Sequence, residues 1–456
     1  MPKRLCATVH FLLPFALPTR PQPSSVPEND AGYGVRHADE NLPEDGDRDT
    51  PSLPASRGGD GAAGVNGGAE ADRTLRALLQ ALQTPGLDAT IRRARRVDRD
   101  PGEDFQRSLP ESRWLARQYG LPPGTASQDA PLAPYMLLAD GGTPDPAAAG
   151  VGAGTAIEWA CLELAHIEVT HDRLVLSHPQ SLDIPEAEAS ALAQEMAASA
   201  TARGLHFVAP TSARWYLGDS RGGLLTGLQG ASPLRAAGRS IDIWLPIDET
   251  RIDPHGMPAR SSKWIGFQTE LQMAWHEHPV NVARAARGAR PVNAVWLHGR
   301  GAWPPAAVTD VSAAPFSATF ADSPAARGMA LAANTPAAPL PADFAALMTA
   351  LSTRGAVADT GNAGATPTRA QASDTVLVQS DALSVPMVHE AWHEWLDRFA
   401  AFDRQWFAPA IQALRDSTID EIRLTLCGEQ ASTTLSLRRG DLWAFWRRRA
   451  FADLLT

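Results

Sequence analysis

An apolar run near the N-terminus, Ala7–Phe15, restricts the fold more than any other part of the chain. A short run that is apolar on both faces is typical of a strand in a parallel sheet, which helices cover on both sides. The basic residues before it also resemble the start of a secretory signal. However, Pro14 and Pro18 interrupt the apolar stretch, and no small-residue cleavage site follows promptly. We therefore expect Ala7–Phe15 to be the first strand of a buried sheet.

Segments with strand and helix character alternate along the rest of the chain. Apolar residues at helical spacing mark the helices, and short apolar runs mark the strands. This alternation predicts an α/β fold with a mostly parallel sheet. The expected strands are two short ones within 159–177, then 205–209, 241–245, 292–297, 375–379, 422–427 and 433–437. The expected helices include 186–202, 263–276, 388–414 and a Trp-rich terminal helix from Leu442.

Composition argues against several functional classes. The chain has 456 residues, 44% of them hydrophobic, and a chain of this length usually forms about two or three domains. Its formal charge of −10 argues against a general nucleic-acid-binding protein. No apolar run reaches the ~18–20 residues that a membrane span needs. Three widely separated cysteines favour a reducing compartment. We therefore expect a cytoplasmic protein with no nucleic-acid and no membrane partner.

Changes in composition divide the chain into seven parts. Between Glu28 and Asp49, eight acidic residues stand against two arginines, and few large apolar residues accompany them. Such a segment cannot bury enough apolar area to fold by itself, so we expect it to be disordered. The expected parts are a first core strand (1–18), the disordered acidic insertion (19–70), core helices and a linker (71–150), an inserted α+β domain (151–275), a return to the core (276–303), a loose Ala/Pro-rich region (304–373) and the C-terminal part of the core (374–456).

Standard catalytic motifs do not identify a nucleophile. The chain has no Walker-type loop, no G-x-S-x-G elbow, no H-E-x-x-H and no paired C-x-x-C. His389 and His393 have the i, i+4 spacing that presents two metal ligands on one helix face. Their aromatic neighbours instead favour the polar border of a core helix, which we prefer.

The segment from His278 to Gly301 carries the densest set of candidate site residues. Arg284 offers a fork of donors suited to a phosphate or carboxylate. Asn281 and Asn293 suit either a binding site or a turn. Glycines after the expected strand allow close approach of the backbone to a ligand or to a neighbouring loop. From residue types alone, the structural and the functional interpretations stay equally open.

The same segment carries a family resemblance. It reads His278-Pro279-x-Asn281-x-x-Arg284-x-x-x-Gly288-x-x-Pro291 and ends at Gly299-x-Gly301. This pattern resembles archaeal-type cofactor-independent phosphoglycerate mutases. The whole chain is more similar still to a bacterial family known either as such a mutase or as regulatory protein RpfE. Supporting stretches are 9–16, 84–88, 214–217, 242–246 and 441–447.

The resemblance implies an alkaline-phosphatase-like core, in which an inserted α+β domain splits a doubly wound, mostly parallel sheet. Active members hold two divalent metal ions with Asp and His ligands, and a Ser nucleophile carries the phosphoryl group. Two metal ions activate the nucleophile and neutralise charge on the transferred phosphoryl group. That mechanism requires clustered carboxylates and imidazoles.

This chain departs from the family pattern at the metal ligands. After the first strand, the mutases have Asp-Gly-x-x-Asp, whereas Pro14-Phe15-Ala16 stands here. The later Asp-x-x-Gly-His motif keeps only Asp381, and residues 426–432 replace Asp-His-Ser-Thr-Pro. His298 takes the position of a phosphate-facing Arg. We therefore expect a mutase-like fold that has lost its dinuclear metal site, needs no cofactor and has a binding or regulatory role.

The expected ligand is a phosphorylated or other anionic metabolite. Its candidate contacts are Arg284, His298 and Arg300, with Asn281 and Asn293 beside them.

Two alternatives stay open. One is an active Mn- or Zn-dependent enzyme with rearranged ligands, namely Asp381, His389 and His393. The other is a protein partner bound through Trp443, Trp446 and Arg447–Arg449, because aromatic and Arg side chains are common interface anchors.

Overall fold

A computed structural model describes most of the chain. The described residues are 6–18, 77–78, 80–152, 155–170, 173–305, 314–360 and 374–455. One compact unit contains Met1–Pro18 and Leu82–Thr456, and the other is Thr19–Ala81. The expected disordered insertion, 19–70, lies outside the described residues.

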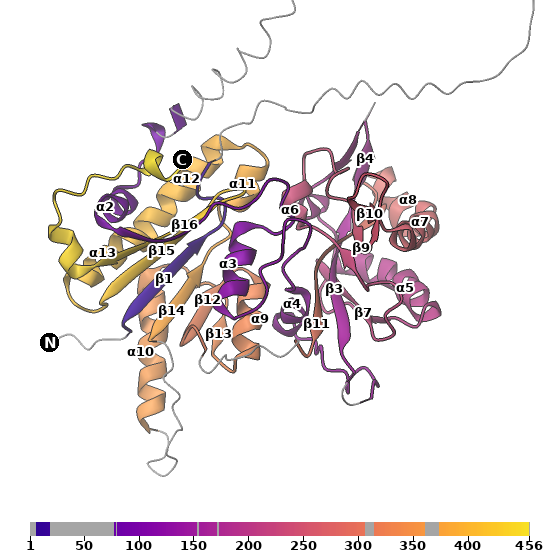
Figure 1. Cartoon of the computed structure of the whole chain (residues 1–456), viewed down its shortest axis with the longest axis horizontal. Helices are drawn as coiled ribbons and strands as arrows, with labels where there is room; N and C mark the ends of the chain where they lie inside the picture. The colour runs from indigo at the N-terminus through magenta and orange to yellow at the C-terminus, as the bar shows by residue number, and fades with distance from the viewer. Residues whose placement is uncertain are drawn as a thin grey trace, which may run out of the picture. The chain divides into compact units, whose positions relative to one another are not determined.

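A seven-stranded sheet forms the centre of this unit (Figure 1). Its order is β13 (Ala337–Ala338), β12 (Ala318–Ala321), β14 (Thr375–Gln379), β1 (Thr8–Leu13), β15 (Glu421–Cys427), β16 (Ser432–Arg438) and β2 (Arg95–Asp100). β1 runs parallel to β14 and β15, and all six of its residues are buried. The expected first strand and the mixed α/β fold with a mostly parallel sheet are thus confirmed.

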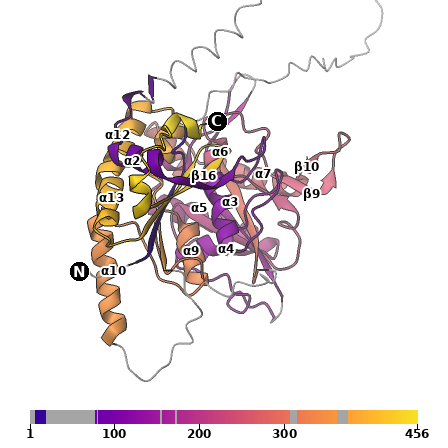
Figure 2. The same cartoon turned by 60° about the vertical axis from the view of Figure 1, so that its left-hand side comes forward.

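Helices cover both faces of the central sheet (Figures 1 and 2). One face carries α2 (Pro85–Arg93), α10 (Phe344–Thr360), α12 (Trp392–Phe402) and α13 (Ala408–Arg415). The other carries α3 (Pro110–Gln118), α4 (Ala133–Ala139) and α9 (Pro324–Ala332). Phe11 of β1 packs edge-on against Phe402 and Phe407 beneath the first face. Apolar side chains therefore leave β1 on both sides, as its composition predicts.

A second, antiparallel sheet is built from the middle of the chain. Its order is β11 (Ala294–Trp303), β3 (Ile157–Ala165), β7 (Arg214–Asp219) and β6 (His206–Val208). Buried side chains of α5 (Glu186–Ala202) and α7 (Ser262–His276) pack against it, which confirms both expected helices. Smaller elements beside it are β4 (Ile167–Val169), β5 (Leu174–Leu176), η1 (Pro179–Leu182), β8 (Leu228–Gln229), α6 (Pro233–Ala236), β9 (Ile247–Ile252), β10 (Pro258–Arg260) and α8 (Pro279–Ala286).

Two of the expected boundaries are wrong. Residues 276–303 do not return to the central sheet, because β11 pairs with β3 in the second sheet. Residues 304–373 are not loose throughout, since 314–360 supply β12, α9, β13 and α10. Their many alanines resemble low-complexity sequence, but they are the small residues that α9 needs for close packing.

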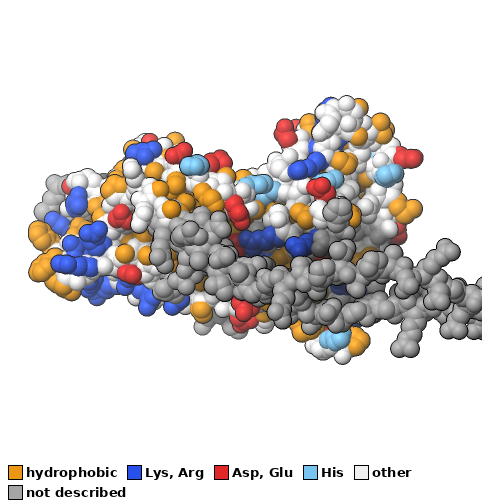
Figure 3. Space-filling view, turned by 90° about the horizontal axis from the view of Figure 1, so that it is seen from above, with side chains coloured by type: hydrophobic (Ala, Val, Ile, Leu, Met, Phe, Trp, Pro, Cys, Tyr) orange, Lys and Arg blue, Asp and Glu red, His pale blue; other side chains and the backbone are white. Residues whose placement is uncertain are grey.

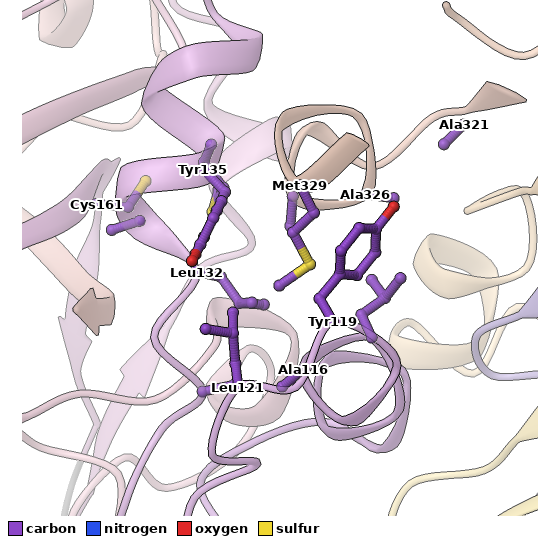
Figure 4. Packing of buried hydrophobic residues seen from close by; sticks show 14 of the residues in the cluster. Ala116, Tyr119, Leu121, Leu132, Tyr135, Cys161, Ala321, Ala326 and Met329 are labelled. Carbon is purple, nitrogen blue, oxygen red and sulfur yellow. The ribbon is translucent and has the colours of Figure 1, made fainter. Parts of the chain in front are cut away.

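The two sheets meet through a buried cluster around α4 and α9. In Figure 4, Met329 of α9 lies between the rings of Tyr119 and Tyr135. Gly328 lies so close to α4 that an added Cβ would stand 1.7 Å from the Tyr135 carbonyl oxygen. Only glycine permits this approach, so the contact of the two helices depends on one residue.

The C-terminal segment is not the predicted helix. It consists of two short 3-10 turns, η3 (Arg439–Trp443) and η4 (Phe451–Leu454), with an irregular stretch between them. Trp443 and Trp446 point into solvent rather than into a core, so the apolar face that would stabilise a helix is absent here. None of the helices in the described ranges is both long and apolar enough to span a membrane.

Candidate functional site

Four parallel strands of the central sheet end at one edge. The residues that follow them are Asp322 after β12, Asp381 after β14, Pro14 and Phe15 after β1, and Glu429 after β15. Ligands of open α/β sheets bind outside the carboxyl ends of the strands. This edge is therefore the expected location of a ligand site.

Asp381 and Asp322 form a hydrogen-bonded pair at this edge. The backbone N–H of Asp381 donates to Asp322 Oδ2 at 3.0 Å, and Ser380 Oγ donates to the same oxygen at 3.2 Å. Gln379 Nε2 donates to Asp381 Oδ1 at 2.5 Å. Burial, and then the nearby Asp322 charge, raise the pKa of Asp381 to about 7. Near neutral pH, Asp381 is therefore partly protonated.

Glu111 lies in the first turn of α3 and is buried. Burial raises the pKa of this carboxyl to about 7, with a further small contribution from Asp381 and an opposing one from Arg235. Its Oε2 atom has no hydrogen-bond partner within the described part of the chain. When it is protonated, a buried carboxyl group without a partner can donate a hydrogen bond to a ligand.

Arg235 of α6 brings a buried cation to the same edge. Its Nη1 donates to the Glu429 carbonyl at 2.5 Å, and its Nη2 donates to the Ser108 carbonyl at 2.9 Å. Its Nε is buried, and no described residue accepts from it. Burial lowers the pKa of Arg235 to about 10, although Glu111 and Glu429 oppose this. The guanidinium thus lacks full electrostatic compensation from the protein.

A histidine pair and a serine complete the group. The rings of His178 and His389 lie 5.6 Å apart. His178 Nδ1 accepts from the backbone N–H of Gln180, which places the proton on Nε2, and this buried atom has no described partner. Ser384 Oγ, on α11 (Ser384–Val388), is likewise buried without a described partner.

We call Glu111, His178, Arg235, Asp381 and Ser384 the edge site. α6 and α11 are in contact above the carboxyl ends of β1 and β14 (Figure 1). Figure 3, seen from above, shows histidine, acidic and basic side chains on this face. Buried polar groups in native proteins nearly always have partners. Four such atoms lie on the elements around one sheet edge, where bound water or a ligand can supply their partners, and this makes the edge our candidate site.

The edge site does not fit the dinuclear metal centre that the family resemblance implies. The turn after β1 presents the Phe15 carbonyl, which accepts from Trp395 Nε1 at 3.0 Å, instead of a carboxylate. The Glu429 carboxylate is held by Arg239. Across the described residues, no three His, Cys, Asp or Glu side chains form a group that could hold a metal ion. Asp381, His389 and His393 accordingly do not come together as a metal site.

Asn281 and Asn293, two of the ligand contacts predicted from the sequence, make hydrogen bonds within the protein. Asn281 Oδ1 accepts from Val292 N–H at 2.8 Å, and its Nδ2 donates to the Trp275 and Val292 carbonyls. Asn293 bonds the backbone of Ile167 in both directions at 2.8 Å. These side chains hold the connection between α8 and β11, and the structure does not bring them to the edge site.

Arg284 is buried and lies against α5. Its Nη1 donates to Glu188 Oε2 at 2.6 Å, and its Nε donates to the Arg290 carbonyl at 2.7 Å. It lines an open depression of about 530 Å³ together with Arg287 and Arg290. Glu188 neutralises part of this positive charge. An anion-binding role for Arg284 stays a prediction.

His298 and Arg300 lie on β11, in the second sheet, where they contact glutamates of β3. His298 Nε2 is 3.1 Å from Glu163 Oε1, and its pKa is raised because contacts with Cys161 and Glu163 outweigh burial. Arg300 Nη1 donates to Glu158 Oε2 at 2.6 Å beside a depression of about 220 Å³. The five predicted ligand contacts are thus spread over several places, and their binding role also stays a prediction.

Sequence reasoning missed Glu111, His178, Arg235 and Ser384. None of them belongs to a motif, and they lie far apart in the chain. In the sequence, these residues stand out only because they lie after or between predicted core elements. Many ordinary surface residues lie in such positions, so this does not identify a site.

The fold and the edge site define a mixed α/β protein with a candidate ligand site at the carboxyl edge of its central sheet. No family model and no curated protein matches the sequence. Among solved structures, the chain is similar to the PH0037 protein from Pyrococcus horikoshii, with 12% identity, 95% of this chain and 87% of that chain covered, and a TM-score of 0.46. It is also similar to the cofactor-independent phosphoglycerate mutase from Thermoplasma acidophilum DSM 1728, with 14% identity, coverages of 95% and 90%, and a TM-score of 0.33.

Proposed function

We propose that this chain is a phosphoglycerate mutase-like protein with an alkaline-phosphatase-like core, which binds a phosphorylated or other anionic metabolite at the edge site. In this proposal it does not transfer phosphoryl groups through metal ions, and its role is regulatory. The observation that carries the proposal is the buried Arg235, whose Nε lacks a partner, near the buried Glu111, whose Oε2 also lacks one.

A phosphate or carboxylate oxygen supplies what both groups need. It accepts a charge-assisted hydrogen bond from Arg235 Nε, and such bonds are stronger than neutral ones. It also accepts from the carboxyl of Glu111 while that group is protonated, below a pH of about 7. The buried guanidinium gains a counter-charge in the same step.

The edge site supports anion binding better than metal-dependent catalysis for an electrostatic reason. Two of its carboxyl groups, Glu111 and Asp381, have pKa values raised to about 7, so they carry less than full charge under physiological conditions. Arg235 brings a buried positive charge to the same edge, and no three His, Cys, Asp or Glu side chains among the described residues form a group that could hold a metal ion. We also propose a cytoplasmic location, which is consistent with three buried, unbridged cysteines.

Calorimetric titration of the purified protein with phosphoglycerate, and with glycerate as a control lacking the phosphoryl group, tests the proposal. We expect phosphoglycerate to bind and Arg235→Met to weaken binding by about tenfold or more, since a charge-assisted contact contributes roughly 1.5–3 kcal/mol. Arg290→Met and Arg300→Met serve as matched controls, because each removes an Arg that lines one of the two depressions described above and does not belong to the edge site.

The possible results separate the alternatives. A loss of binding in a control variant but not in Arg235→Met would move the site to the residues predicted from the sequence. Mutase turnover together with stoichiometric Mn or Zn in the purified protein would reject the proposal in favour of an active enzyme. Binding of no phosphorylated compound would also reject it.

A further inference from the structure

Three large aromatic side chains protrude from the C-terminal segment. Trp443, Phe445 and Trp446 are 79%, 73% and 68% exposed, and the rings of Phe445 and Trp446 lie edge to face at 5.3 Å. Single exposed apolar residues need no explanation, but adjacent ones forming a patch mark interaction sites. Three such side chains within four residues form a patch of this kind.

The backbone beneath these side chains is held in place. Arg93 Nη1 donates to the carbonyls of Ala444 and Arg447 at 2.7 and 3.1 Å, and Arg447 Nη1 donates back to the Arg93 carbonyl at 3.0 Å. Asp441 Oδ1 accepts from both Arg95 and Arg447. These reciprocal bonds fix the segment to the end of α2 and the start of β2. The aromatic side chains are therefore presented by an ordered backbone, which lowers the entropy cost of binding.

Unpaired positive charge lies on the same segment and on β2, whose first residue is bonded to Asp441. The side chains of Arg96 on β2 and of Arg448 are exposed and form no hydrogen bond or ion pair with any residue that the structure describes. The pKa of Arg449 is lowered, first by burial and then by the neighbouring charges of Arg96 and Arg447. Figure 3 shows basic and hydrophobic side chains together at the end of the molecule where Figure 1 draws the C-terminal segment.

We propose that Trp443, Phe445, Trp446, Arg96 and Arg448, here called the Arg–Trp patch, bind an acidic segment of another protein that also carries apolar side chains. Carboxylates of the partner pair with the unmatched guanidinium groups, and its apolar side chains cover the exposed rings. A symmetric contact with the same patch of a second copy does not fit, because it would place arginines against arginines. The patch lies apart from the edge site, so the inference is independent of the proposed function.

An acidic peptide fits the patch better than a nucleic acid or an anionic membrane, in which every unit carries a negative charge. Along β2, Asp98 stands between Arg96 and Arg99, and all three are exposed. A nucleic acid or an anionic bilayer would bring phosphate against this carboxylate. A peptide can place a neutral or basic residue opposite Asp98 and acidic residues on either side.

Selection from a random peptide library displayed on phage tests the inference with the full chain as bait. We expect the selected peptides to combine Asp or Glu with Leu, Phe or Trp. A labelled synthetic copy of the most enriched peptide should bind about tenfold more weakly to Trp446→Ser and to Arg448→Glu than to the wild type, as loss of an interface anchor predicts. Met273→Ser and Arg251→Glu are matched controls on exposed residues of α7 and β9, and they should bind as the wild type does.

Circular dichroism melts confirm that each variant folds before binding is compared. Enrichment of no acidic motif, or equal binding by the patch variants and the controls, would overturn the inference. A second result would also overturn the inference. It is that peptides fail to bind, while the protein binds phosphatidylserine vesicles or a single-stranded oligonucleotide and the patch variants weaken that binding. The patch would then have a different partner.

Discussion

Replacing Glu111 by Gln should stabilise the protein at neutral and alkaline pH. The wild-type carboxyl is buried, and its pKa is raised from 4.5 to about 7 in the folded protein. The folded protein therefore holds this proton more tightly than the unfolded chain does. As pH rises from about 4.5 to about 7, the unfolded chain releases the proton first, and the free energy of unfolding falls. Gln has nearly the same shape and never acquires the charge.

The size of the effect follows from the pKa shift. Each pKa unit corresponds to 1.36 kcal/mol, so the shift from 4.5 to about 7 makes the Glu111→Gln variant about 3 kcal/mol more stable than the wild type above pH 7. Below pH 4.5 the two proteins should differ little. Urea unfolding followed by tryptophan fluorescence, repeated on both sides of this pH window, measures the difference directly.

Glu421→Gln provides a control of opposite sign. Burial alone would raise the pKa of Glu421, but hydrogen bonds from Arg423 and Ser436 outweigh it and lower the pKa. This substitution should therefore destabilise the protein at neutral pH, and the loss should shrink as pH falls through the range in which the wild-type carboxyl is protonated. A stability difference between Glu111→Gln and the wild type that stays constant from pH 4.5 to above 7 would refute the reasoning about the edge site.

Two further predictions concern packing and a buried ion pair. Gly328→Ala should cost about 3 kcal/mol or more, because the new methyl group would meet the Tyr135 carbonyl; Gly266→Ala, on an open face of α7, should instead stabilise by up to ~1 kcal/mol. Thermal unfolding of both variants checks this, and equal melting temperatures would contradict it. Arg284→Ala should cost about 2–3 kcal/mol, because it leaves the Glu188 carboxylate and two carbonyl groups with fewer donors. Urea unfolding measures the loss, and a neutral result would show that the contacts of Arg284 are not structural.

Local patterns predicted the parts of the fold that depend on local chemistry. The apolar run of β1 identified a strand buried on both faces, and helical spacing identified α5 and α7. Both signals depend only on which faces of one element are buried. The same reasoning failed for α9, whose alanines look like a linker until the partner helix is known. It gives no signal for the edge strand β2 either, because five of its six residues are exposed and no apolar alternation marks it.

The candidate site was harder to predict than the fold, because it is assembled from distant residues. Glu111 comes from α3, Arg235 from α6 and Asp381 from the end of β14. No spacing rule connects positions separated by more than a hundred residues. The residues that do form a compact sequence pattern, Asn281, Arg284 and Asn293, make hydrogen bonds over a few local turns and to neighbouring strands. A dense pattern of Asn, Arg and Gly can thus reflect a demanding backbone connection.

The charges at the edge site indicate which kind of ligand it favours. The Glu429 carboxylate already neutralises Arg239, and no three His, Cys, Asp or Glu side chains among the described residues form a group that could hold a metal ion. Burial of Arg235 then leaves a positive group whose compensation depends on the ionisation of Glu111. If Glu111 is protonated, the guanidinium attracts an anion; if it is ionised, the two groups compensate each other. We therefore expect anion affinity at this edge to fall as pH rises through about 7, and to fall less in Glu111→Gln, in which Asp381 still loses a proton in that range.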